Sequence, residues 1–134
     1  MDHEQKCIKE FMLAGDQTVR SCPSTDVTPQ EKLLRIKLML SELSELIDAI
    51  TDNNLIAIAD GIADLIYVTK GTALTYGIDI EPIFNEVQRS NMSKCTDGKL
   101  IKDISGKVLK PDTYSPPQLK PFLDRQTDSI WHSL

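Results

Sequence analysis

Four carboxylates lie at helical spacing near the middle of the chain. Glu42 and Glu45 are three residues apart, and Asp60 and Asp64 are four residues apart, so each pair shares one side of its segment if both segments are helical. The turn sequence at residues 51–54 lets the two segments pack antiparallel, which would bring the four groups together. Two unit charges about 4 Å apart repel by roughly 1 kcal/mol in water and about 4 kcal/mol at an effective dielectric constant of about 20. Such a cluster requires a positive partner.

A divalent cation is the natural partner for these carboxylates. No lysine or arginine occupies the matching turn of the second segment, because Lys70 lies well past Asp64 and on another face. Mg²⁺ binds carboxylate oxygens and keeps positions open for water and phosphate, and Mn²⁺ is a possible substitute. A bound ion of this kind polarises a phosphoryl oxygen and lowers the pKa of an attacking water. The four residues therefore predict a hydrolytic metal centre.

The alternative is that these carboxylates are solvated surface charges or partners in helical ion pairs, as most helical carboxylates are. For Glu42 and Glu45 alone this interpretation is preferred. Asp60 and Asp64 favour a functional role, because they interrupt a segment that is otherwise nearly free of charge and an unpaired buried carboxylate is costly. Taken together, the four residues favour the metal site.

The elements that would position these groups are helices. Apolar side chains recur at three-and-four spacing in four segments, and we predict helices at residues 3–14, from Thr28 to about Ile50, from Leu55 to Tyr76, and from Asp79 to about Ser93. A capping box of Thr28 and Glu31 begins the second helix, with a proline in its first turn. The third helix is apolar in almost every direction, which predicts that it is buried, and Gly77 is placed to end it.

The pattern changes beyond Asp97-Gly98. The segment KLIKDISGKVLK at residues 99–110 has Ser-Gly at its middle and alternating flanks, which predicts a small β-hairpin. Prolines at positions 111, 116, 117 and 121 predict an extended tail, with a short turn of helix up to Trp131.

The length of 134 residues fits one domain with one ordinary core. We predict a single all-α domain, a bundle of four to five helices, with its core at about 3–94 and the hairpin and tail at about 95–134. So small a bundle cannot cover its long apolar third helix on every side. We therefore expect a partner subunit to supply the missing cover, in a homodimer or a homotetramer.

The composition excludes several classes of protein. A net charge of −5 argues against binding to nucleic-acid polymers, which need a basic surface. No stretch approaches the roughly 20 apolar residues of a membrane span, and the charged first ten residues argue against a signal peptide. Three cysteines without a C-x-x-C pair predict neither disulfides nor a zinc site. We expect a soluble cytoplasmic protein whose small anionic substrate is bridged to it by a cation.

Two segments resemble the E-x-x-E and E-x-x-D blocks of the all-α nucleoside triphosphate pyrophosphohydrolases. They are LMLSELSEL (38–46) and IADGIADLIYV (58–68). That superfamily includes the MazG proteins, the dimeric dUTPases and the phosphoribosyl-ATP pyrophosphohydrolases. The stretch GTALTYGIDIEPIFNEVQRSNMSK (71–94), followed by DGK and by GKVLKP (106–111), is similar to the MazG-like branch. The resemblance spans about residues 5–120.

The resemblance implies Mg²⁺-dependent hydrolysis between the α and β phosphates of a nucleoside or deoxynucleoside triphosphate, giving a monophosphate and pyrophosphate, with a house-cleaning role in the nucleotide pool. Glu42, Glu45 and Asp64 match the family's metal-binding positions, and Glu45 or Glu42 would orient or deprotonate the attacking water. Asn91 and Lys94 fall in its S-N-x-S-K segment, which is associated with phosphate or sugar contacts.

Three further residues are candidates for substrate contact. Arg89 is a neighbour of the S-N-x-S-K segment, and Gln17 lies in the first loop, where it could touch a base. Tyr67 is the third, although packing is the more common role for such a residue.

One position departs from the family's pattern. The family's second glutamate, three residues before Asp64, is Gly61 here, and the adjacent Asp60 is a candidate replacement. Because glycine offers no side-chain ligand, two alternatives stay open. One is a non-catalytic nucleotide-binding homologue, and the other is a purely structural helical dimer.

Overall fold

The computed structural model describes the backbone of residues 1–131 and the side chains of residues 1–128. In this range the chain forms five helices and one small sheet: α1 (His3–Ala14), α2 (Pro29–Thr51), α3 (Leu55–Thr75), α4 (Ile80–Met92), β1 (Cys95–Thr96), β2 (Lys99–Leu100) and α5 (Lys120–Trp131). The predicted all-α fold class is confirmed, and the four predicted helices are found within a residue or two of their expected ends.

The helices begin at the capping residues that the sequence predicts. The Thr28 hydroxyl accepts a hydrogen bond from the Glu31 N–H at 3.1 Å, and the Glu31 carboxylate accepts one from the Thr28 N–H at 2.9 Å, which completes the capping box of α2. Asn54 caps α3 and Asp79 caps α4 with their side-chain oxygens. Gly77 follows α3 in the left-handed conformation (φ 72°), which glycine adopts without steric cost.

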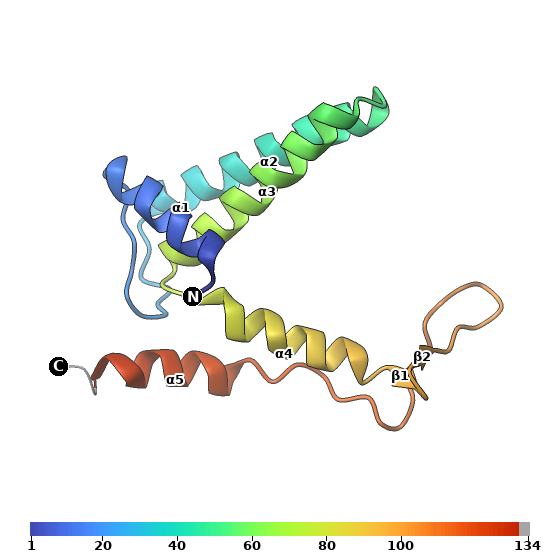
Figure 1. The fold of residues 1–134 in the computed structure, drawn as a ribbon. Coiled ribbons are helices and arrows are strands. Elements are labelled where there is room, and N and C mark those ends of the chain that lie inside the picture. The colour runs from blue at the N-terminus through green and yellow to red at the C-terminus, as the bar shows by residue number, and fades with distance from the viewer. Residues whose placement is uncertain (132–134) are drawn as a thin grey trace.

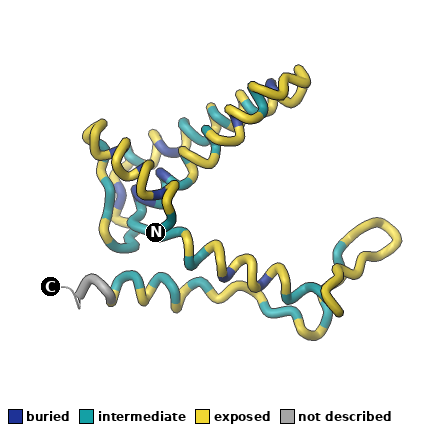
Figure 2. Tube along the Cα trace, viewed as in Figure 1, coloured by how far each residue is buried: buried dark blue, intermediate teal, exposed yellow. Residues whose placement is uncertain are grey.

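Helices α2 and α3 form a long antiparallel hairpin, and α1 packs across its open end (Figure 1). The buried apolar cluster lies at this crossing and consists of Ile8, Met12 and Leu74. Figure 2 shows most buried segments gathered there, while the far half of the hairpin is largely exposed. The Lys70 ammonium on α3 pairs with Asp2 at 2.7 Å and with Glu4, which holds the start of α1 against α3.

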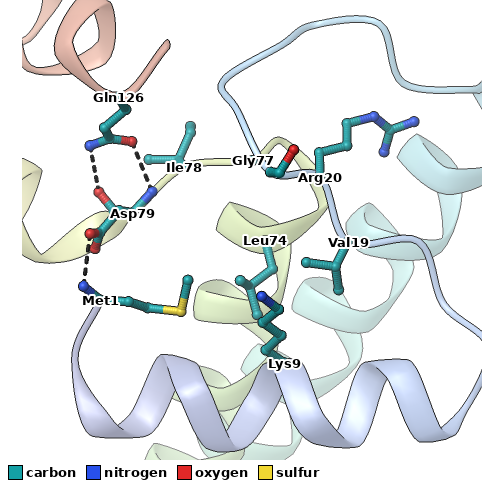
Figure 3. A pocket seen from close by; sticks show the side chains of 10 residues that line it. Met1, Lys9, Val19, Arg20, Leu74, Gly77, Ile78, Asp79 and Gln126 are labelled. Carbon is teal, nitrogen blue, oxygen red and sulfur yellow. Dashed lines mark hydrogen bonds and ion pairs between the residues drawn. The ribbon is translucent and has the colours of Figure 1, made fainter. Parts of the chain in front are cut away.

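Helix α4 diverges from the α2–α3 hairpin, and the chain then returns along α4 as an extended tail, so that α5 lies beyond the start of α4 (Figure 1). Gln126 of α5 ties this return to the α3–α4 junction. It accepts a hydrogen bond from the Asp79 N–H at 2.9 Å and donates one to the Asp79 carbonyl at 3.0 Å (Figure 3). Helix α5 is a 12-residue element, so the prediction of a single turn underestimated its length.

The predicted β-hairpin is present in part. Its regular pairing lies earlier than expected, where β1 and β2 pair antiparallel around Asp97-Gly98. Both turn residues have positive φ, 49° and 75°, as tight hairpin turns require. Around the predicted Ser105-Gly106 turn, the pairing is one isolated bridge between Lys102 and Val108, beyond which the chain loops out.

Within the described residues, one apolar face of the α2–α3 hairpin has no cover. Its exposed side chains are Leu33, Ile36, Leu40, Leu43, Ile47, Ile50, Leu55, Ile56, Ile62 and Ile66. The predicted burial of the third helix is therefore not achieved by one chain alone, because α4 diverges from this face. Exposed apolar surfaces of this extent are typical of interaction sites. Across the described helices, a length and apolar character sufficient to cross a bilayer do not occur together.

Candidate metal centre and active site

Three carboxylates meet between α2 and α3. Glu42 and Glu45 on α2 and Asp64 on α3 each offer an oxygen that lies within 4.8 Å of the others. The antiparallel packing of the two helices brings Asp64 level with the glutamate pair, as the sequence predicts. Glu42 and Asp64 are half-buried, whereas Glu45 is exposed. Asp60, the fourth predicted ligand, is exposed and lies about one helical turn from Asp64, outside this group.

Of the three carboxylates, only that of Glu42 has a buried oxygen without a hydrogen-bond partner. Its Oε2 atom is closed off from solvent and has no hydrogen-bond partner. Burial raises the pKa of Glu42, and the negative charges of Glu45 and Asp64 raise it further. In the described part of the chain, no lysine or arginine forms an ion pair with any of these three carboxylates.

A divalent cation fits this set of donors. A buried carboxylate oxygen without a partner costs free energy, and three oxygens from three side chains are the ligands that Mg²⁺ and Mn²⁺ prefer. The three residues that resemble the family's ligands are thus the three that the fold brings together.

Gly61 has a structural role in the same region. It is buried, and a Cβ atom built there would lie 3.2 Å from the Cα, Cβ and Cδ1 atoms of Leu46. The backbones of α2 and α3 approach closely at this point, one residue from Glu45 and three residues from Asp64. The position therefore serves helix packing and supplies no side-chain ligand, while the adjacent Asp60 lies outside the group of three carboxylates.

A pocket of about 150 Å³ lies beside the carboxylates. Its lining residues come from α1, the first loop, α2 and α3: Ile8, Phe11, Met12, Gln17, Arg35, Leu38, Tyr67 and Val68. Leu38 is four residues before Glu42, and Tyr67 is three residues after Asp64, so on both helices the pocket is about one turn, ~5.4 Å, from the cluster.

Two predicted substrate contacts, Gln17 and Tyr67, line this pocket. The Tyr67 ring also packs edge-to-face on Phe11, with centroids 5.6 Å apart and an interplanar angle of 85°. Tyr67 thus has the packing contact that its residue type favours, and it borders a cavity as well. The remaining lining is mostly apolar, which suits the flat face of a nucleobase.

Arg35 is a site residue that the sequence reasoning missed. It is only 5% exposed, and it donates hydrogen bonds to Thr72 Oγ1 at 3.2 Å, Gln17 Oε1 at 3.2 Å and the Val68 carbonyl at 2.8 Å. Burial lowers the pKa of Arg35. A signal was available, because Arg35 lies seven residues before Glu42 and so shares its side of the helix.

The predicted contacts on α4 lie elsewhere in the chain. Arg89, Asn91 and Lys94 are at the far end of α4, which points away from the α2–α3 hairpin (Figure 1). Arg89 makes a two-pronged ion pair with Glu86, at 2.9 and 2.7 Å, and the Lys94 ammonium donates to Asn91 Oδ1 at 3.2 Å. Within one chain these three residues do not join the carboxylates.

A second pocket, of about 260 Å³, lies between α1, the first loop and the start of α4 (Figure 3). Its carboxylate, Asp79, already pairs with the Met1 ammonium at 2.8 Å. The predicted site residues are not among those that line it. The carboxylate cluster and its neighbouring pocket are therefore the better candidate for an active site.

Two comparisons with known proteins bear on the family of this chain. An uncharacterized protein of Acanthamoeba polyphaga mimivirus is 39% identical to this chain over 56 residues, which are 42% of this chain and 22% of the viral protein. The chain therefore aligns with less than a quarter of that relative's length. The sequence model of the phosphoribosyl-ATP pyrophosphohydrolase family matches residues 8–91, which include the three clustered carboxylates and the pocket beside them. This match covers more than half of the chain, and the protein belongs to the phosphoribosyl-ATP pyrophosphohydrolase family, within the MazG-like superfamily.

Proposed function

We propose that this protein is a metal-dependent nucleoside triphosphate pyrophosphohydrolase. It cleaves the anhydride between the α and β phosphates of a nucleoside or deoxynucleoside triphosphate and releases a monophosphate and pyrophosphate. The observation that carries the proposal is the unpartnered Oε2 atom of Glu42 within a cluster of three carboxylates. Family membership supports the hydrolysis of a pyrophosphate bond in general, and the choice of triphosphate is ours.

Glu42, Glu45 and Asp64 would hold Mg²⁺, or Mn²⁺ in its place. When bound, the ion polarises a phosphoryl oxygen and lowers the pKa of the attacking water. Glu45 is the exposed member of the cluster, so it can reach a water and accept its proton. The water oxygen bonds to a phosphorus of the α–β anhydride, the bond to the bridging oxygen breaks, and monophosphate and pyrophosphate leave.

The pocket beside the cluster would hold the nucleoside. Its distance of about one helical turn from the carboxylates lets the phosphates reach them while the base lies among Phe11, Tyr67 and Leu38. Gln17 offers a polar group at the wall of this pocket. The pocket therefore supports a nucleotide rather than free pyrophosphate as the substrate.

A second copy of the chain would complete the structure. The exposed apolar face of α2 and α3 needs cover, and burial of such a face is the usual basis of a stable homo-oligomer. A homodimer or homotetramer could also bring Asn91, Lys94 and Arg89 of one subunit toward the phosphates of a neighbouring site. A small cytoplasmic enzyme of this kind would act in house-cleaning of the nucleotide pool.

The direct test is release of pyrophosphate from a panel of ribo- and deoxyribonucleoside triphosphates, and from phosphoribosyl-ATP, with Mg²⁺ or Mn²⁺. Glu45→Gln should lower kcat/KM by roughly 100-fold or more while the fold is retained, because the proton acceptor is lost. Glu10→Gln removes an exposed charge on α1 and serves as the matched control. Equal activity of Glu45→Gln and the control would refute the proposed role of Glu45.

Two alternatives have their own signatures. A non-catalytic nucleotide-binding homologue would gain thermal stability from nucleotide and Mg²⁺ without releasing pyrophosphate. A purely structural helical dimer would show no change in melting temperature, whereas a specific ligand at about 100 times its Kd adds about 2.7 kcal/mol to the free energy of unfolding.

A further inference from the structure

Arg35 is a buried cation whose partners are all neutral. Its guanidinium donates to a threonine hydroxyl, an amide oxygen and a backbone carbonyl, and no carboxylate of the described chain forms an ion pair with it. A buried charge without a counter-ion is costly. Such a residue is better explained by what it positions than by its contribution to stability.

The residue that Arg35 positions at the pocket wall is Gln17. A guanidinium can only donate hydrogen bonds, so the Gln17 carboxamide must turn its oxygen toward Arg35, as the 3.2 Å contact shows. Its NH₂ group then faces the other way and makes no hydrogen bond within the described residues. Because Gln17 lines the pocket, this NH₂ group is the donor that its side chain has left to offer there.

Gly71 makes room for this arrangement. A Cβ atom built at Gly71 would come within 2.5 Å of the Nη2 atom of Arg35 and 3.4 Å of its Cζ atom. The absence of a side chain on α3 thus forms a cradle in which the guanidinium lies against the helix. Arg35 cannot swing within this cradle without breaking its bond to the Val68 carbonyl.

These contacts imply a preference among substrates, and this inference rests on the function proposed above. We infer that Arg35 is a positioning residue that fixes Gln17 as a hydrogen-bond donor to the base, so that the site prefers bases with an oxo group over those with an amino group at the same position. The oxo group accepts from the Gln17 NH₂ group, whereas an amino group would face it donor to donor. Uracil and hypoxanthine are favoured over cytosine and adenine.

The test compares two matched pairs of nucleotides that differ at this one position. Binding of dIMP against dAMP, and of dUMP against dCMP, is measured by calorimetry in the presence of Mg²⁺. We expect the oxo member of at least one pair to bind roughly tenfold more tightly, as the loss of a hydrogen bond to the half-buried Gln17 implies. Equal affinities within both pairs would overturn the inference.

Gln17→Glu tests the orientation itself. The new carboxylate would pair with Arg35 and so maintain the fold, but it offers only acceptors to the base. The preference for the oxo nucleotide should fall to about one or reverse. Gln88→Glu adds the same charge on the exposed surface of α4 and should leave the preference unchanged. An unchanged preference in Gln17→Glu would contradict the inference.

Gly71→Ala tests the role of Arg35 without removing its charge. The new methyl group displaces the guanidinium, so the preference for the oxo nucleotide should weaken at least threefold, measured at a temperature where the variant is folded, since the displacement also lowers the melting temperature. The two proposals fail in different ways. Absence of pyrophosphate release with preserved oxo selectivity in binding refutes the catalytic function, whereas catalysis without selectivity refutes the role of Arg35. Failure of all four nucleotides to bind refutes the role of Arg35, whereas the catalytic function is decided by pyrophosphate release from the triphosphates.

Discussion

Glu42 and Glu86 both lie on helices and are both at least partly buried. Their carboxylates differ in their hydrogen-bond partners, in their neighbouring charges and in the direction in which their pKa is shifted. Glu86 on α4 is 7% exposed, and it accepts two hydrogen bonds from Arg89 and one from the Gln118 N–H at 2.9 Å. The Arg89 guanidinium, together with this N–H, holds the pKa of Glu86 at about 2. Among the described residues Glu42 has no lysine or arginine as an ion-pair partner, and burial raises its pKa.

Glu86 is therefore a structural carboxylate, whereas Glu42 has the surroundings of a carboxylate that binds a ligand. Glu86 and Arg89 join α4 to the returning tail, because Arg89 also donates to the carbonyls of Ser115 and Pro116. The charge of Glu86 is neutralised by Arg89 within the chain. In the α2–α3 region the chain leaves three negative charges together, so their neutralisation must come from outside.

The largest expected effect separates the two carboxylates by activity. Glu42→Gln should lower kcat/KM for triphosphate hydrolysis by roughly 100-fold or more, since one of the proposed cation ligands is lost. Glu86→Gln should leave kcat/KM within a few-fold of wild type under conditions where it is folded. Steady-state kinetics at saturating Mg²⁺ provide the comparison. A similar loss in both variants would remove the distinction between the two regions.

The next effect concerns the close approach of α2 and α3. Gly61→Ala places a methyl group 3.2 Å from Leu46 atoms that include backbone, so we expect a loss of about 1–3 kcal/mol in the free energy of unfolding. Gly15→Ala is the control, because a Cβ atom there meets only ordinary contacts at 3.6–3.7 Å. Denaturant titration measures both. Gly61→Ala as stable as the wild type would show that the contact is loose.

A smaller effect concerns the melting temperature, which should change in opposite directions when each of the two carboxylates is removed. Without divalent cations, Glu42→Gln should raise the melting temperature by a few degrees, because it removes a repelled and desolvated charge. Glu86→Gln should lower the melting temperature, because Arg89 and the tail lose an acceptor. Calorimetry in EDTA decides the signs. A decrease in both variants would mean that Glu42 already has a partner.

The smallest effect is the response of the α4–tail contact to pH. The pKa of Glu86 is depressed from 4.5 to about 2 in the folded protein, so its contribution to stability is full above about pH 4.5 and is lost as the pH falls toward 2. The Gln118 amide resonance should titrate in this window and lose the transition in Glu86→Gln. A midpoint near the ordinary value would show that the ion pair does not form in solution.

Local sequence determined the helices and two of the three cluster members. The capping box at Thr28 and Glu31, the turn before Asn54 and the stop at Gly77 act through neighbouring backbone groups, and helical periodicity alone places Glu42 and Glu45 on one side. Spacing also put forward Asp60 and Asp64 as a pair, and the resemblance to the family's ligand positions singled out Asp64. These features depend on spacing along one or two adjacent helices, which sequence encodes directly.

Only the tertiary structure decided which polar groups meet across helices. Asp60 and Asp64 are equivalent by spacing, yet the packing at Gly61 leaves Asp60 outside the cluster. The local sequence around Arg35 shows only that it shares a side of its helix with Glu42. It lines the pocket because α1, the first loop and α3 pack around it. The divergence of α4, which separates Asn91 and Lys94 from the carboxylates, follows from contacts between α4, the tail and α5 that are distant in sequence. Spacing along a helix sets which side a residue occupies, but the partner that covers that side is chosen by long-range packing.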